Sequence, residues 1–133
     1  MPIAPKISHK IEDDVLHVTV EGWVKVSEMA AYASDHIVVW ASSPRLIWDL
    51  RTTIFFDISS EVLTSMSDTF TEAHGVRAGW RTALVVREQE TLLGDLVVEL
   101  TKSNNVPVEH QIFRSVNEAR SWLFAFSPES LVR

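Results

Sequence analysis

The sequence contains no cysteine and only 4 glycines. The absence of cysteine excludes disulfides, thiolate catalysis and cysteine-based zinc sites. No glycine-rich loop that could cradle a phosphate occurs. There is neither a signal-peptide stretch nor an apolar run long enough to cross a bilayer, so no membrane span is predicted. We therefore expect a soluble, cytoplasmic protein.

Basic residues are in the minority and are scattered: 12 Lys and Arg stand against 18 Asp and Glu, a formal net charge of -6. Nucleic acid requires a basic patch on its partner, so no nucleic-acid partner is expected. The 133 residues, 46% of them hydrophobic, contain no repeat and no linker. These properties predict a single globular domain, residues 1–133.

The hydrophobic pattern switches between the period of strands and the period of helices. Alternation around Asp13-Asp14 predicts a β-hairpin over 6–22 that ends at Gly22. Spacings of three and four predict one helix over 26–40, capped by Ser27. Further strands are expected at 45–50, 81–88 and 108–113, and further helices at 60–74, at 90–105 and from the capping box of Ser115 and Glu118 onward.

Strands that alternate with helices require parallel neighbours and right-handed crossovers. The order therefore predicts an α/β fold with a five-stranded, mostly parallel sheet, an antiparallel N-terminal strand and four helices. The strand over 45–50 is apolar at nearly every position, which is typical of a strand buried on both faces.

Four segments carry a resemblance to a known family: "EDDVLHVTVEG", "RLIWDLR", "RTALVV" and "HQIFRSVNEARSWL". Their order along the chain resembles the STAS superfamily, and most of all its SpoIIAA-like, STAS/SEC14-like branch. The resemblance implies a SpoIIAA-like βα superhelix. It also implies a non-catalytic regulatory module that binds a protein partner.

The STAS phosphoacceptor segment is similar to F-x-D-S-S-G-L, and the nearest stretch here is "FFDISSEV". The resemblance places Asp57 on the family's acid and Ser59 on its phosphorylated serine. Ile58 and Ser60 stand where the family has a serine and a glycine. Ser59 and Ser60 are therefore the phosphoacceptor candidates. The alternative is that Asp57 or Ser59 only caps the helix that follows, because both residue types are preferred there.

Aromatic residues precede this segment, in a stretch expected to be a connection. Phe55 and Phe56, with Asp57, form a predicted interaction loop on which a partner docks between Thr52 and Ser60. The alternative is that the two phenylalanines fold down as a lid on the core.

Charged residues stand at the expected carboxyl ends of the parallel strands, where open α/β folds bind ligands. Asp49, Arg51, Arg87 and Arg114 form this predicted strand-end rim. Three arginines on one rim are suited to hold an anion or a phosphorylated serine. The alternative is that strand ends reach solvent and simply carry charge there.

Asp49 follows an apolar run, and burying an unpaired carboxylate is costly. We expect its partners to be amides of the following loop or a nearby arginine such as Arg87. Asp49 is thereby predicted to order the loop that leads to Ser59.

No catalytic or metal-binding motif accompanies these residues. The hairpin register places His9 and His17 on opposite faces, and no zinc-type histidine spacing occurs, so no metal and no cofactor are predicted. No nucleophile elbow is present. The sequence favours a non-enzyme; the alternative function is a SEC14-like binder of a lipid or other small apolar ligand, which rests on fold analogy.

Overall fold

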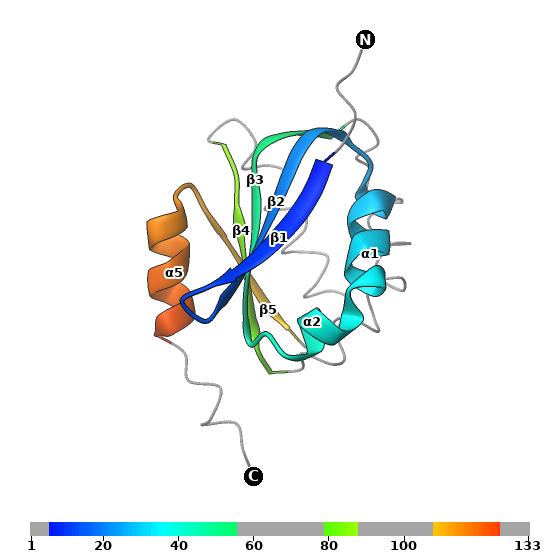
Figure 1. Ribbon diagram of the computed structural model, residues 1–133. Coiled ribbons are helices and arrows are strands. Elements are labelled where there is room, and N and C mark those ends of the chain that lie inside the picture. The colour runs from blue at the N-terminus through cyan, green and yellow to red at the C-terminus, as the bar shows by residue number, and fades with distance from the viewer. Residues whose placement is uncertain (1–5, 56–78, 88–107, 126–133) are drawn as a thin grey trace.

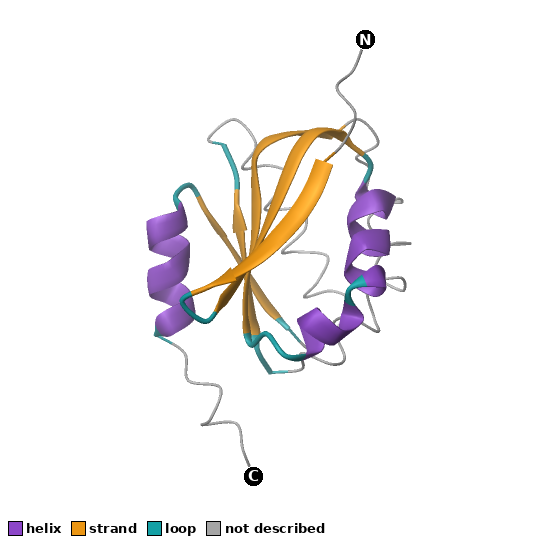
Figure 2. Cartoon of the chain, in the orientation of Figure 1, coloured by secondary structure: helices purple, strands orange, loops and turns teal. Residues whose placement is uncertain are grey.

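The computed structural model describes residues 6–55, 79–87 and 108–125. They form one five-stranded sheet in the order β1-β2-β3-β4-β5, with helices on both faces (Figures 1 and 2). β1 is antiparallel to β2, and the remaining neighbours are parallel. The predicted α/β class and the predicted sheet are confirmed.

The hairpin consists of β1 (Lys6–Glu12) and β2 (Val15–Val24). Asp13 and Asp14 both have positive φ, 51° and 64°, which is the conformation of a tight two-residue turn whose twist matches that of the strands. The prediction that β2 ends at Gly22 is wrong. The pairing with β3 shifts register between Thr19 and Glu21, and Gly22 continues the strand with a φ of 87° that only glycine adopts at little cost.

The three parallel strands are β3 (Arg45–Phe55), β4 (Arg81–Val85) and β5 (Glu109–Phe113). β3 is five residues longer than the predicted strand 45–50, because its second half pairs with the end of β2. Its pairing with β4 stops at Asp49↔Val85. Phe55 is therefore the last residue of a strand, and its assignment to a connecting loop from Thr52 onward is corrected.

The predicted helix over 26–40 is interrupted. Two helices, α1 (Val26–Asp35) and α2 (Ile37–Ala41), meet at His36, whose φ of -118° and ψ of 31° are not helical. The β-branched run that follows His36 has low helix propensity, which favours a break at this point. Lys25 rather than the predicted Ser27 is the N-cap, and its backbone N–H donates to Glu28 Oε1 over 3.2 Å.

The last described helix is α5 (Val116–Phe124). Ser115 caps it as predicted, since the Glu118 N–H donates to Ser115 Oγ over 3.1 Å. At the other end Arg45 Nε and Arg81 Nη1 donate to the Leu123 and Trp122 carbonyl oxygens, at 3.1 and 2.8 Å. These cations neutralise the negative end of the helix dipole and fix α5 against the sheet.

The described residues contain three helices, so the expected count of four is slightly off. The predicted helices 60–74 and 90–105 lie outside the described residues. None of the three helices has the length and apolar character that a bilayer crossing requires.

The sheet separates two hydrophobic cores. On one face α1 and α2 cover a cluster that includes Val18, Trp40 and Trp48. On the other face α5 places Ala119 and Leu123 against Ile47 and Val85. β3 contributes to both clusters, so its residues 46–50 are buried whichever way they point, as predicted.

Candidate functional site

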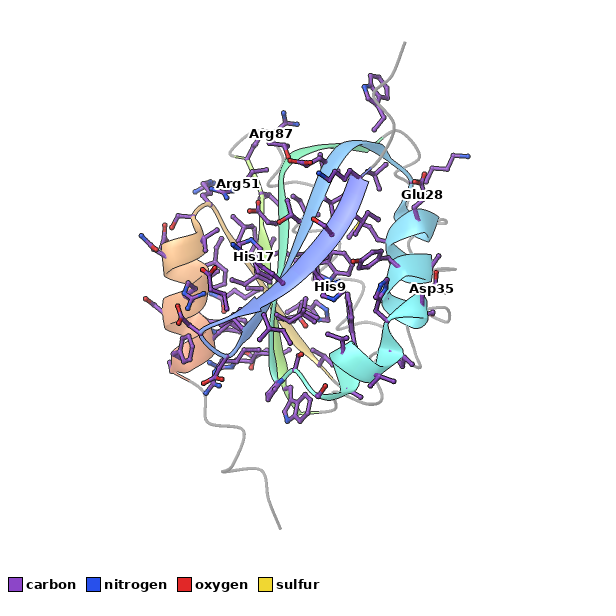
Figure 3. The ribbon with its side chains drawn as sticks, viewed as in Figure 1. His9, His17, Glu28, Asp35, Arg51 and Arg87 are labelled. Atoms are coloured by element: carbon purple, nitrogen blue, oxygen red, sulfur yellow. The ribbon has the colours of Figure 1, made fainter. Side chains whose placement is uncertain are left out.

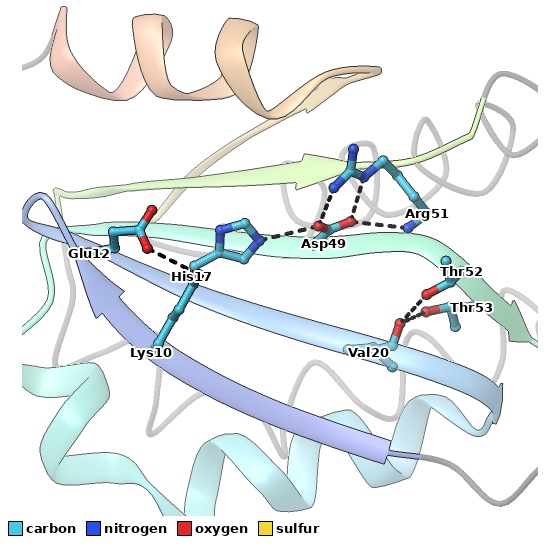
Figure 4. Close-up of polar contacts among 8 residues, drawn as sticks. All are labelled: Lys10, Glu12, His17, Val20, Asp49, Arg51, Thr52 and Thr53. Carbon is cyan, nitrogen blue, oxygen red and sulfur yellow. Dashed lines mark hydrogen bonds and ion pairs between the residues drawn. The ribbon is translucent and has the colours of Figure 1, made fainter.

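Asp49 is a carboxylate on the doubly covered strand, and only 7% of the residue is exposed. Arg51, two residues on along β3, binds it in a fork: Nε donates to Oδ1 over 2.9 Å and Nη2 to Oδ2 over 2.7 Å. The Arg51 backbone N–H also donates to Oδ1, over 3.3 Å. His17 of β2 completes the set, with its Nε2 3.2 Å from Oδ2 (Figure 4).

The electrostatic balance of this cluster favours the ionised acid. Burial alone would raise the pKa of Asp49, but the hydrogen bonds from Arg51 and His17 outweigh it and hold that pKa well below its usual range. The same hydrogen bond to Asp49 raises the pKa of Arg51. Because a carboxylate only accepts hydrogen bonds, the His17 contact requires a proton on Nε2.

The prediction that Asp49 finds partners in an amide and a nearby arginine is thus confirmed in kind, but the arginine is Arg51 and not Arg87. The amide belongs to Arg51, inside the strand rather than in a following loop. Arg87 does not bind Asp49; its Nη2 donates to the Thr53 carbonyl oxygen over 3.3 Å. Asp49 is therefore joined to β2 through His17, and Arg87 supports the end of β3 separately.

A second polar contact stabilises the shift between β2 and β3. The Thr53 hydroxyl donates to the Val20 carbonyl oxygen over 2.7 Å, and Thr52 approaches the same oxygen at 3.4 Å (Figure 4). Val20 lies at the register shift, where the regular ladder is interrupted. Buried Thr53 thus satisfies a backbone carbonyl at the interruption, and the strand continues toward Phe55.

The predicted strand-end rim is distributed over three strands. Arg87 and Arg114 lie just beyond β4 and β5, and Arg51 lies beyond the last pair that β3 makes with β4. Because these strands are parallel neighbours, the three positions are at one edge of the sheet, and Arg51 and Arg87 appear near it in Figure 3. Arg51 is neutralised by Asp49, whereas Arg114 is exposed. Anion binding by this rim stays a prediction.

Ser59, Ser60, Asp57 and Phe56 lie outside the described residues, and so does any ordering of their segment by Asp49. The assignments to a phosphoacceptor, an interaction loop or a helix cap therefore stay predictions.

Sequence reasoning placed Asp49 and Arg51 together on the strand-end rim, but it did not place His17 with them. In the parallel pairing His17 faces Ile47 and Thr19 faces Asp49, so His17 and Asp49 are diagonal neighbours on one face. Period-two alternation already separates each of them from the alternate, fully apolar positions of its strand. Their proximity follows only once the register between β2 and β3 is known.

The hydrogen bonds of the cluster indicate a structural role for Asp49. Both of its oxygens accept two hydrogen bonds, so the carboxylate has little capacity left to take a proton from a substrate. Within the described parts of the chain, no group of three or more histidine, aspartate or glutamate side chains could hold a metal ion.

No protein-family model and no curated protein sequence matches the chain. Among solved structures, an anti-sigma factor antagonist from Mycobacterium paratuberculosis superposes with a TM-score of 0.60 at 14% identity, covering 91% of this chain and 95% of that one. An uncharacterised protein of the DUF3478 family with a SpoIIAA-like fold, from Shewanella loihica PV-4, gives 0.53 at 10% identity, covering 92% and 95%. The chain has the STAS, or SpoIIAA-like, fold, and the resemblance is confirmed at that level.

Replacing Asp49 tests the structural role of the cluster. Asp49→Ala leaves the donors of Arg51 and His17 without their acceptor, and we expect the free energy of unfolding to fall by about 1–3 kcal/mol. Glu12→Gln is the control, because the exposed Lys10–Glu12 pair at 3.0 Å is screened by solvent and should contribute little to stability. Urea denaturation followed by tryptophan fluorescence measures both. Equal stability of the two variants would contradict the structural role.

The lowered pKa of Asp49 also predicts how stability depends on pH. A carboxyl whose pKa is lower in the folded state contributes stability above its unfolded pKa of about 4 and loses it as pH falls further. The stability difference between the wild type and Asp49→Asn should therefore shrink between about pH 5 and pH 3. Urea titrations at fixed pH values measure it. A difference that stays constant or grows over this range would refute the assignment.

Proposed function

We propose that this chain is a non-catalytic regulatory module of STAS type that acts by binding a protein partner. The observation that carries the proposal is the fold, which the chain shares over 91% of its length with an anti-sigma factor antagonist. The full coordination of Asp49 by Arg51 and His17 agrees with it, because that carboxylate serves the structure rather than a reaction.

The proposed docking surface is the carboxyl edge of the sheet and the segment that leaves it. β3 ends at Phe55, so the chain that carries the predicted interaction residues Phe56 and Asp57 starts at this edge. The Asp49–Arg51 fork and the Thr53–Val20 bond secure the strand just before that point. A partner that binds there would meet a segment whose starting position is defined by buried polar contacts.

Control by phosphorylation is the finer part of the proposal, with Ser59 as the first candidate and Ser60 as the second. A phosphate adds roughly two negative charges and would alter the docking of any partner at that edge. Arg87 and Arg114 follow β4 and β5 at the carboxyl edge of the sheet, and they are cations that a phosphate at that edge would attract. Intact-mass measurement and phosphopeptide mapping on protein from its own cells show whether either serine carries phosphate.

The test of the docking surface compares two substitutions of apolar residues. Phe55→Ala/Phe56→Ala should abolish capture of a partner from the native cell, because Phe55 ends β3 at the proposed docking surface and Phe56 follows it. Val38→Ala is the control, since Val38 is an apolar side chain with 78% exposure on α2, a different element. Circular dichroism establishes that both variants are folded.

Identical partner sets for the wild type and the double variant would remove this edge from the proposal. Native mass spectrometry of the purified wild type addresses the SEC14-like alternative at the same time. A copurifying lipid in place of a protein partner would favour that alternative.

A further inference from the structure

Two histidines and a tyrosine form a cluster where the edge strand meets the helices. His9 of β1 lies with its ring centroid 5.0 Å from that of His36, at an interplanar angle of 72°. Tyr32 of α1 stacks on His36 at 4.1 Å, and Trp40 of α2 lies 6.0 Å from Tyr32. Both imidazoles are partly buried. Figure 3 shows His9 on the side of β1 that faces α1.

Tyr32 connects the two imidazoles through hydrogen bonds. Its hydroxyl lies 2.6 Å from His9 Nδ1, and its carbonyl oxygen lies 2.8 Å from His36 Nδ1. Because a carbonyl only accepts, Nδ1 of His36 carries the proton in this contact. His36 is also the residue that separates α1 from α2, and its backbone N–H donates to the same Tyr32 carbonyl over 3.1 Å. The cluster thus joins β1 to the junction of two helices.

The described surroundings of the cluster are apolar and hold no counter-ion for it. On this face, β1 contributes Ile7, and β2 contributes Val18 opposite His9. The described ion pairs involve neither imidazole.

Each packed element carries few charges near the cluster. β1 directs its charged residues Lys6, Lys10 and Glu12 to alternate, exposed positions, and β2 has only valines and a leucine on this face.

On α1, Glu28 accepts from the backbone of Lys25 at the first turn, and Asp35 is exposed and lies away from His9 in Figure 3. α2 has no charged residue. The other titratable group is the Tyr32 hydroxyl, whose pKa is raised by burial.

We propose that His9, Tyr32 and His36 form an acid-sensitive clasp that holds the edge strand β1 to the α1–α2 junction. In the structure the two imidazoles share Tyr32 and pack edge to face. An imidazole ordinarily gains its proton near about pH 6.5. The ring of Tyr32, stacked on His36 at 4.1 Å, can accommodate one charge, but two charges with centroids 5.0 Å apart repel each other. Acid therefore increases the local opening of β1 and α2, while the centre of the sheet stays closed.

Amide hydrogen exchange of the whole chain at about pH 7.5 and pH 5.5, corrected for intrinsic exchange, tests the clasp. Amides of 6–12 and 36–41 should exchange at least about fourfold faster at the lower pH. This factor corresponds to the repulsion between two unit charges about 5 Å apart in a medium with the dielectric constant of water. Amides of 45–50 in β3 should not change. A uniform increase that includes 45–50, or no increase in 6–12 and 36–41, would overturn the proposal.

Substitutions distinguish an acid response caused by the His9–His36 pair from one caused by protonation of any histidine. His9→Asn and His36→Asn keep a polar atom near the position of Nδ1 and leave one titrating ring, so each should abolish the acid response. His110→Asn is the matched control: His110 Nδ1 also contacts a backbone carbonyl, that of Val108 at 3.0 Å, but on the distant β5. It should retain the response. The proposal fails if either clasp variant keeps the wild-type response or if the control loses it.

A measurement on the wild type does not depend on how the variants fold. In a nuclear magnetic resonance titration, the ring protons of His9 and His36 should follow curves that deviate from independent single-site titration, because each charge affects the other. Two independent single-site curves would overturn the clasp.

Discussion

Burial of β3 on both faces is the constraint on which the rest of the structure depends. Residues 46–50 of this strand are buried on both faces, so a polar side chain among them must be satisfied by the protein itself. Asp49 is such a side chain, and it is satisfied by Arg51 on its own strand and by His17 on the neighbouring strand. The cost of burying one acid is thereby offset by a contact that connects β2 to β3.

The second half of β3 continues beyond the buried core. Beyond the pair Asp49↔Val85, β4 no longer accompanies it, and the strand depends on β2 alone. The Asp49 cluster and the Thr53–Val20 bond lie at this transition. They secure the chain where it leaves the sheet, which is the edge that open α/β folds use for ligands. The proposed docking surface follows from this arrangement.

Much of this fold could be predicted from the sequence because its signals are local. Alternation around Asp13-Asp14 identified the hairpin and its register, and the capping pair of Ser115 and Glu118 located the start of α5. The break at His36 was missed, because the apolar period of three and four runs through it undisturbed. At the break the His36 side chain bonds to the carbonyl four residues earlier, a contact that the apolar pattern does not show.

The candidate site was less accessible to sequence reasoning, because its contacts cross between strands. That Asp49 needs a partner follows from burial alone, whereas the choice of His17 over Arg87 depends on the register between β2 and β3. The extension of β3 was missed for a related reason: Thr52 and Thr53 read as the start of a loop, yet they pair with β2 beyond a register shift.

The central claim is that Asp49 couples β2 to β3 through His17, and a double-mutant cycle tests it most directly. The free energy of unfolding is measured by urea denaturation for the wild type, His17→Ala, Asp49→Ala and the double variant. A coupling energy of about 1 kcal/mol is predicted, because removing either partner breaks the same buried hydrogen bond. A coupling energy within about 0.3 kcal/mol of zero would mean that the two residues act independently, and it would contradict the claim.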